Sequence, residues 1–310
     1  MKLPLALAAP LIFPRTANAA LVPPAFLNSV VALGFRGPGV VDGAPVASIW
    51  HTIGTGFFYG KLTSKNESDF AKRKYAPFLV TAKHVVDGFE KTKLQMSAIG
   101  NMKVRINPVD EKTPGGEFDL NVDLAVKGFA NWKANPNGKD VSVIPVDLNG
   151  LRDRKYESAF FTSDENSANR EKLRQLGASA GDGVFVLGFP MDLAGLQKNY
   201  VVVRQGAIAR ISELLDSASD NLLLDAFVFP GNSGGPVILR PEIVSIQGTK
   251  VNNKAYLIGL VNASVNYTDT ATSIQTGRPR ILFEENSGLA NVSPTDYIDD
   301  TIATFPVAEE

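Results

Sequence analysis

The sequence contains no cysteine and only two histidines among its 310 residues. The absence of cysteine excludes disulfides, a thiol nucleophile, thiolate zinc sites, cysteine-ligated iron–sulfur clusters and a lipid anchor on cysteine. With only His51 and His84 available, a histidine-rich metal site is not expected, and we expect no other cofactor. Any chemistry that needs an imidazole must therefore use one of these two residues.

A strong charge of either sign is also missing. The chain has 31 basic and 32 acidic residues, a formal net charge of −1, which gives no electrostatic reason to expect nucleic-acid binding. Apolar residues make up 44% and charged residues 20%, as in ordinary globular proteins. No apolar run reaches the length of a membrane span, so we expect no stable membrane insertion. The sequence leaves the oligomeric state open.

The amino terminus has the features of an export signal. Lys2 precedes an apolar stretch from Leu3 to Phe13, and Ala17–Ala19 has the small-x-small form of a signal-peptidase site. Residues 1–19 are therefore predicted to be a signal peptide, and residues 20–310 a secreted or periplasmic protein. The alternative is an apolar leader on a cytoplasmic protein.

Short apolar runs rich in β-branched residues recur along the chain, separated by Gly, Pro, Asn and Asp. This pattern predicts an all-β protein, and the nearly continuous apolar runs are typical of strands that line a closed barrel. No βαβ alternation and no Gly-rich phosphate loop is present, which argues against a nucleotide-binding fold. The predicted strands are Val46–Ile53, Gly56–Tyr59, Pro77–Thr81, Val122–Val126, Val141–Val146, Val184–Gly188, Tyr200–Val203, Leu222–Val228, Pro236–Leu239 and Tyr256–Val261.

Two helices are predicted. Residues 163–176 carry strong helix formers after an acidic start. In 294–304, Ser293 is a candidate N-cap and Pro294 suits the first helical position. The polar segment 148–182 divides the chain into two strand-rich halves.

The most specific motif is Phe-Pro-Gly-Asn-Ser-Gly-Gly-Pro-Val at 229–237. A nucleophilic serine needs a tight turn that exposes its hydroxyl and directs backbone N–H groups at one point. Glycines on both sides of Ser233 permit such a turn and a close approach of substrate. The alternative is a Gly/Pro loop that only joins two strands.

Two further motifs precede it. Thr-Ala-Lys-His-Val-Val at 81–86 is a strand that runs into His84, which on its own would be interpreted as a structural histidine. Asp-Leu-Ala-Val at 123–126 places an acidic residue at the start of an apolar strand, where a buried carboxylate needs a partner such as an imidazole N–H. Asp119 is the competing candidate for this partner, and a turn aspartate is the alternative for both.

TAKHVV, DLAV and GNSGGPV follow one another in the order His, Asp, Ser. In this order the chain resembles the trypsin/chymotrypsin-like serine proteases, and it is most similar to bacterial trypsin-like peptidases of the HtrA/Deg type. The similarity extends over residues 45–300, and it is poor at 61–76 and 128–180. HtrA-type chains usually carry a PDZ domain after the protease domain. This chain leaves no room for one, so we expect a stand-alone peptidase.

The resemblance implies a fold of two six-stranded antiparallel β-barrels. The first barrel would span residues 45–148 and the second 180–292, with a short C-terminal helix at 294–304. The active site would lie in the cleft between the barrels.

The resemblance also implies a serine endopeptidase that acts on protein or peptide substrates through an acyl-enzyme. Ser233 would attack the peptide carbonyl, His84 would transfer the proton, and Asp123 would hold the imidazole. The backbone amides of Gly231 and Ser233 would form the oxyanion hole.

Substrate preference follows from the family alignment alone. The pocket-bottom position, six residues before the serine, is Phe227, and Ser264 falls on a pocket wall. Neither is acidic, so cleavage after Lys or Arg is disfavoured and a shallow apolar pocket is predicted. Asn262 is expected to support Asp123. His51 lies outside all three motifs, so we expect a structural or surface role for it.

Two alternatives remain open. A catalytically silent binding module could have the same fold, because the sequence does not show whether the three side chains converge. A hydrolase of another acyl substrate would share the chemistry, but no GxSxG motif favours a lipase fold. The lack of disulfides sets the chain apart from animal trypsins and favours a bacterial-type relative.

Overall fold

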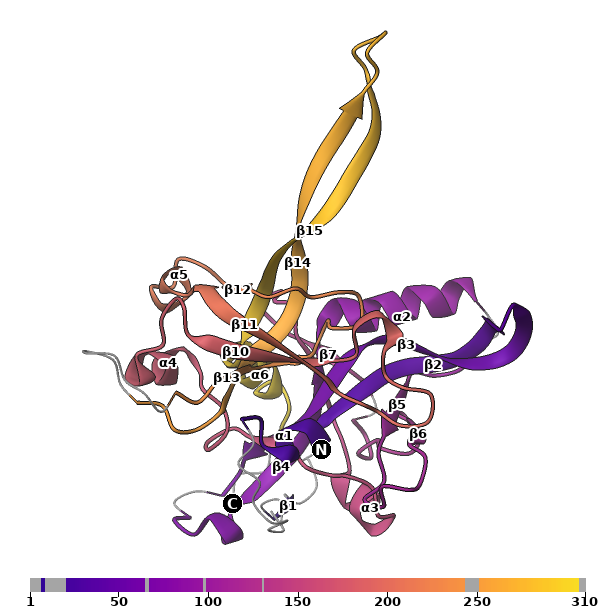
Figure 1. Cartoon of the computed structure of the whole chain (residues 1–310). Coiled ribbons are helices and arrows are strands. Elements are labelled where there is room, and N and C mark those ends of the chain that lie inside the picture. The colour runs from indigo at the N-terminus through magenta and orange to yellow at the C-terminus, as the bar shows by residue number, and fades with distance from the viewer. Residues whose placement is uncertain are drawn as a thin grey trace.

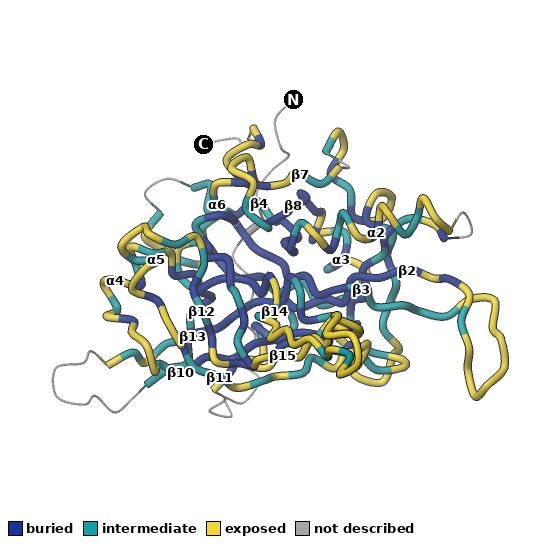
Figure 2. The backbone as a smooth tube through the Cα atoms, turned by 90° about the horizontal axis from the view of Figure 1, so that it is seen from above, coloured by how far each residue is buried: buried dark blue, intermediate teal, exposed yellow. Residues whose placement is uncertain are grey.

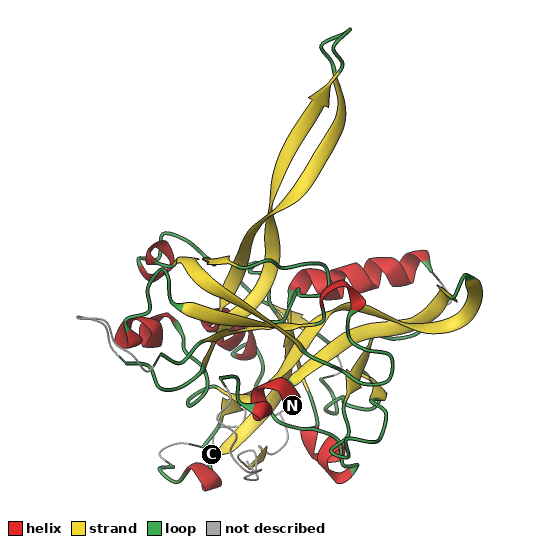
Figure 3. Ribbon diagram, viewed as in Figure 1, coloured by secondary structure: helices red, strands yellow, loops and turns green. Residues whose placement is uncertain are grey.

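The structure, a computed structural model, describes residues 7–8, 21–64, 67–96, 99–129, 131–242 and 251–306. The predicted signal peptide lies outside these residues except for Leu7–Ala8, which pair with β4. Strands dominate, and they form two mainly antiparallel assemblies, a sheet and a closed barrel (Figures 1 and 3).

The amino-terminal half forms a nine-stranded sheet with the main order β6-β5-β2-β3-β4-β8-β7. Its pairing does not close within the described residues, so this half differs from the predicted six-stranded barrel. Its strands are β1 (Leu7–Ala8), β2 (Val30–Val41), β3 (Ala44–Leu62), β4 (Lys74–Thr81), β5 (Lys103–Ile106), β6 (Gly116–Asp119), β7 (Lys133–Ala134), β8 (Ser142–Pro145) and β9 (Phe161–Thr162).

The carboxyl-terminal half is a closed six-stranded barrel with the order β10-β11-β12-β15-β14-β13, as predicted. A mostly β chain with this barrel packed on a second sheet has the chymotrypsin-like fold class. The strands of the barrel are β10 (Gly183–Gly188), β11 (Val202–Arg210), β12 (Leu222–Asp225), β13 (Pro236–Leu239), β14 (Tyr256–Thr272) and β15 (Pro279–Pro294).

Continuous apolar runs occur because strands of the second barrel face two cores. On β10, Val184 and Val186 pack inside the barrel, whereas Phe185 and Leu187 pack into the core of the first half. Side chains alternate between the two faces of a strand, so a strand between two cores has no polar face. Figure 2 shows these buried strands in dark blue at the centre of the molecule. The shared core fixes the two halves against each other.

The helices are short and lie around the sheets (Figure 3). They are α1 (Pro24–Asn28), α2 (Lys83–Gln95), α3 (Leu148–Asp153), α4 (Arg170–Leu176), α5 (Ser212–Leu215) and α6 (Thr295–Ile302), with 3-10 turns η1 (Phe70–Lys72) and η2 (Pro190–Asp192). In the described part of the chain, no helix is long and apolar enough to cross a membrane.

The two predicted helices are present but shorter. Helix α4 begins only at Arg170, because Asn169 caps it by accepting a hydrogen bond from Lys172 N at 2.9 Å. Helix α6 has Pro294 at the N-cap position and no side-chain cap, so Ser293 does not take the predicted role.

Candidate active site

His84 lies in the first turn of α2, directly after β4. The N-cap residue of this helix, Ala82, has no side chain that can accept a hydrogen bond from the free N–H groups of the first turn. The carboxylate of Asp140 accepts one of these groups, the N–H of His84. The sequence predicted the strand before His84 but not this helix.

Asp140 holds His84 at two points. Its Oδ1 accepts a hydrogen bond from the backbone N of His84 at 2.9 Å, and its Oδ2 lies 2.7 Å from His84 Nδ1. The pair is partly exposed, with 49% of the His84 side chain and 30% of the Asp140 side chain accessible. When Nδ1–H donates to Asp140, Nε2 is the ring nitrogen that can accept a proton from another group.

The ionisation of Asp140 follows from this contact. Burial by itself would raise the pKa of the Asp140 carboxyl, but hydrogen bonds and charge attraction from His84 outweigh burial, with help from the backbone of Lys83. The pKa of Asp140 is therefore below its ordinary value. Asp140 is an anion at neutral pH, as an imidazole partner requires.

Strand pairing explains why Asp140 reaches His84. Thr81, at the end of β4, is the register partner of Ser142 at the start of β8. Asp140 comes two residues before Ser142 and His84 three residues after Thr81, so the two side chains meet at the same end of the strand pair.

Asp123 does not contact His84, so its predicted pairing is wrong. Residues 120–123 form a turn and not the start of a strand. The Asp123 carboxylate accepts a hydrogen bond from Asp119 N within this turn, at 2.7 Å. A short polar side chain that satisfies a local backbone amide is the usual reason for an aspartate in a turn.

Asp119, the competing candidate, is equally remote. Its Oδ2 accepts from Asn101 Nδ2 at 2.9 Å, and Asn101 Oδ1 accepts from Lys93 Nζ at 3.0 Å. Lys93 is nine residues beyond His84 on the same helix, which is about 13 Å along its axis. Asp119 is therefore held near the opposite end of α2.

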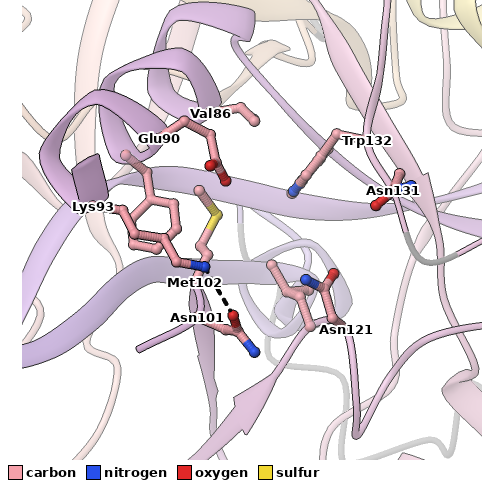
Figure 4. Close-up of a pocket in the computed structure, with 10 residues that line it drawn as sticks. Val86, Glu90, Lys93, Asn101, Met102, Asn121, Asn131 and Trp132 are labelled. Atoms are coloured by element: carbon pink, nitrogen blue, oxygen red, sulfur yellow. Dashed lines mark hydrogen bonds between the residues drawn. The ribbon is translucent and has the colours of Figure 1, made fainter. Parts of the chain in front are cut away.

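Figure 4 shows a hollow that runs along α2 from Val86 to Lys93. It has a volume of about 240 Å³ and lies beside Lys93 and Asn101, with Met102 and Trp132 in its wall. Leu120, from the turn that contains Asp119 and Asp123, also lines it. The turn therefore lines this hollow, and the carboxylates of Asp119 and Asp123 have the partners given above and not His84.

The loop that carries Ser233 packs against the junction of β4 and α2. Ser233 O accepts a hydrogen bond from Thr55 N at 2.9 Å. A Cβ at Gly234, which has φ +81°, would lie 2.2 Å from Thr81 Oγ1 and 2.8 Å from Ala82 N. Only glycine permits this approach, which brings the serine loop to within two residues of His84.

The turn before Ser233 has its backbone held from several sides. Gly231 has φ +97°, and its carbonyl accepts from Thr55 Oγ1 at 2.6 Å. Asn232 is fully buried, and its Oδ1 accepts from Phe229 N at 3.0 Å. These contacts define one conformation of the loop.

This conformation leaves two backbone amides of the loop without a partner in the described part of the chain. The carbonyl of Pro230 accepts from Met191 N at 2.7 Å, and across a trans peptide the N–H of Gly231 points the opposite way. Neither Gly231 N nor Ser233 N donates to another residue of the described ranges. Both are therefore available to a ligand oxygen, and their role as an oxyanion hole stays a prediction.

The predicted pocket residues lie on the same side of the second barrel. Phe227 is half-exposed, and its ring lies parallel to that of Phe229 with centroids 6.4 Å apart. Its edge covers the backbone of Gly288 on β15, where a Cβ would be 3.3 Å away. Ser264 donates to Asn266 Oδ1 at 2.8 Å.

Asn262 and His51 have other partners. Asn262 Nδ2 donates to Asn221 Oδ1 at 3.1 Å, so the expected support of Asp123 is wrong. The ring of His51 stacks on Phe35 at 5.1 Å, and its Nε2 lies 3.0 Å from the carbonyl of Pro38 on β2. Over the described ranges, no group of three His, Asp or Glu side chains could hold a metal ion.

Comparison with known proteins assigns the class. The chain belongs to the trypsin-like peptidase domain family, whose model matches residues 54–242, a range that includes His84, Asp140 and Ser233. The trypsin-like resemblance seen in the sequence is thereby confirmed. Among solved structures it is similar to one described as the HtrA-type protease AlgW with a tripeptide, at 16% identity and a TM-score of 0.42. The match covers 90% of this chain and 60% of that one.

Proposed function

We propose that this protein is a serine endopeptidase in which Ser233, His84 and Asp140 form the catalytic triad. The observation that carries the proposal is the two-point contact of Asp140 with His84, at 2.7 and 2.9 Å, beside the packed loop of Ser233. A carboxylate that fixes Nδ1 of a half-exposed imidazole, with a serine on the adjoining loop, supports acyl transfer. Ser233 Oγ donates to the carbonyl of Asn262 at 3.5 Å in the structure, and the proposed mechanism requires it to turn to His84 Nε2.

In this mechanism Ser233 Oγ attacks the carbonyl carbon of the scissile peptide bond, and His84 Nε2 accepts the hydroxyl proton. The imidazolium formed is stabilised by the Asp140 carboxylate, which stays ionised. The tetrahedral intermediate then collapses, the C–N bond breaks, and His84 returns the proton to the leaving amine. A water molecule hydrolyses the resulting acyl-enzyme by the same steps, with His84 again as the base.

Charge develops on the carbonyl oxygen during both steps. In the proposed mechanism the N–H groups of Gly231 and Ser233 donate to this oxygen, and each such donor typically contributes about 3 kcal/mol to the stability of the transition state. The hydrogen bonds of Gly231 O and Asn232 Oδ1 keep the turn in this orientation before substrate arrives. Such a preformed turn avoids reorganisation at the moment of reaction.

A fluorophosphonate probe tests the proposal directly, because it labels only an activated serine. We expect labelling of the wild type at Ser233, mapped by mass spectrometry, and no labelling of Ser233→Ala. Ser212→Ala, on α5 of the barrel surface, is the control and should be labelled like the wild type. Absence of label on wild-type protein that shows a cooperative thermal transition would contradict the proposal.

A further inference from the structure

Strand β14 continues far beyond the barrel and leaves one of its edges open. Its first residues pair with β13, up to Leu260, but from Val261 to Thr272 its ladder partner among the described residues is β15 alone. Together with β15 it forms a two-stranded hairpin that stands away from both halves of the molecule (Figure 1). An open edge of this length is unusual, because exposed strand edges readily pair with other chains.

The open edge begins at the proposed active site. Gly234 N donates to Val261 O at 2.8 Å, and Ser233 Oγ lies 3.5 Å from the carbonyl of Asn262. A chain that lies along this edge therefore reaches the nucleophile without a gap.

Backbone groups on the open edge are directed outward at every second residue. Val265 O accepts a hydrogen bond from Ser287 Oγ on β15 at 2.6 Å, so the polar groups of Val265 face β15. By alternation, those of Ser264 face the open edge. Beyond the register shift between Val265 and Asn266, Thr270 N donates to Asp269 Oδ1 at 2.7 Å, which places the polar groups of Thr270 on the open edge. Thr268 and Asn266 lie in the same unbroken register and share this phase.

One face of the hairpin carries exposed apolar side chains. Tyr267 and Ala271 lie on β14, and Ile281 and Phe283 are on the same face of β15, opposite Ala271 and Asp269. Tyr267 is 59% exposed, Ile281 57% and Phe283 49%. A two-stranded ribbon is marginal on its own, and a third strand would cover part of this apolar surface.

We propose that the outer part of the open edge of β14, from Val265 to Thr272, binds an extended flank of the substrate by strand addition. The inference rests on the proposed function, and it defines the substrate as an unfolded polypeptide segment longer than the residues around the scissile bond. Beyond Ser264 the edge extends for eight residues, or about 26 Å at the rise of a strand. Main-chain hydrogen bonds supply affinity in this mode, and the apolar face adds a preference for apolar side chains in the flank.

Two proline substitutions on one cross-strand pair test the edge. Thr268 and Glu284 are register partners, and both have their N–H groups directed away from the other strand. Thr268→Pro removes a donor from the edge that leads to Ser233, whereas Glu284→Pro removes one from the outer edge of β15. Proline is tolerated on edge strands, so both variants should fold.

The substrates are a core peptide of about six residues, chosen from cleavage profiling of the wild type, and the same core with eight residues added on either side. We expect a flank on at least one side to raise kcat/KM for the wild type and Glu284→Pro by about tenfold, a modest sum of new hydrogen bonds. Thr268→Pro should lose this gain and cleave the core peptide like the wild type.

A hairpin deletion covers the case in which the proline variant fails to fold. Asn266 and Asn286 are register partners, so an Asn-Gly turn can join them directly. The deletion should also lose the gain.

Equal flank gain in the wild type, Thr268→Pro and the deletion, or no gain at all, would overturn the inference while fluorophosphonate labelling still supports the triad. A wild-type dimer that the deletion converts to a monomer, with flank gain unchanged, would assign the edge to a second copy instead. Loss of labelling and of core cleavage in the wild type would overturn both proposals.

Discussion

The carboxylate of Asp140 contacts the ring and the backbone of His84 at once, at 2.7 Å from Nδ1 and 2.9 Å from N. The second contact replaces the side-chain cap that Ala82 cannot provide for α2. One residue therefore fixes both the orientation of the imidazole and the start of the helix that carries it.

Replacement of Asp140 should abolish most turnover, whereas the same change at Asp123 should not. Asp140→Asn keeps an oxygen for the backbone N of His84 but removes the charge that stabilises the imidazolium, so we expect kcat/KM to fall by about 10³–10⁴. Asp123→Asn, whose side chain serves only its own turn, should stay within about threefold of the wild type. Steady-state cleavage of one peptide substrate by both variants provides the measurement. The reverse ranking would restore Asp123 as the partner of His84.

Much of this site can be predicted from the sequence, because its serine and histidine segments have distinctive neighbours. The glycines at 231 and 234 are dictated by the close backbone approaches that the structure shows. The aspartate that pairs with His84 could not be identified from the sequence in the same way. Asp123 and Asp140 each precede an apolar run, and only the pairing of β4 with β8 determines which of them reaches His84.

The predicted fold has the same limit, because the local sequence identifies strands but not which distant strands pair. Runs such as Val184–Gly188 identify strands because both faces are buried, and this periodicity is local. Whether the strands close a barrel depends on pairing between distant segments, so the open sheet of the first half was not foreseen. The outer part of β14 was missed because residues 266–272 are mostly polar and exposed and lack the apolar alternation of a half-buried strand.

Gly231 should be intolerant of any side chain. It has φ +97°, and a Cβ there would lie 2.2 Å from the carbonyl oxygen of Phe189. Gly231→Ala must therefore move the turn that directs the oxyanion donors, and we expect at least a 100-fold loss of kcat/KM. Gly43→Ala is the matched control, since Gly43 has φ +79° but nothing within 4 Å of its Cβ position. It should lose about 1 kcal/mol of stability and no activity. Similar activity losses in both variants would contradict the proposed role of Gly231.

Glu165 should contribute a stability that disappears in acid. Hydrogen bonds from Lys254 and Arg73 hold the pKa of its carboxyl below the ordinary value. A lowered folded-state pKa stabilises the fold above the unfolded-state pKa, about 4.3, and the contribution is lost as the pH falls through the folded-state value. Because 40% of the side chain is exposed, solvent limits the effect to roughly 0.5–1 kcal/mol.

Urea denaturation of the wild type and Glu165→Gln at several pH values measures this contribution. The difference in unfolding free energy should be largest near pH 7 and shrink below about pH 4.5. Glu171→Gln, which alters the more exposed pair of Glu171 with Arg174, should change stability by less than about 0.5 kcal/mol. A difference between wild type and Glu165→Gln that grows toward acid pH would contradict the sign of the pKa shift.

Phe227 should limit the size of the residue accepted on the amino side of the scissile bond. Its ring lies over Gly288 and parallel to Phe229, at the position that the family alignment assigns to the pocket bottom. We expect the wild type to cleave after small apolar residues, and Phe227→Ala to raise kcat/KM for Leu or Phe at that position by about tenfold, because a vacated ring leaves apolar space. Phe227→Leu should be intermediate.

Profiling with proteome-derived peptides gives the preference, and equal rates of fluorophosphonate labelling show that the triad is unchanged. Dominant cleavage after Lys or Arg by the wild type would contradict the apolar pocket. Neither Phe227 nor Ser264 is acidic, so such a preference would have to come from other residues.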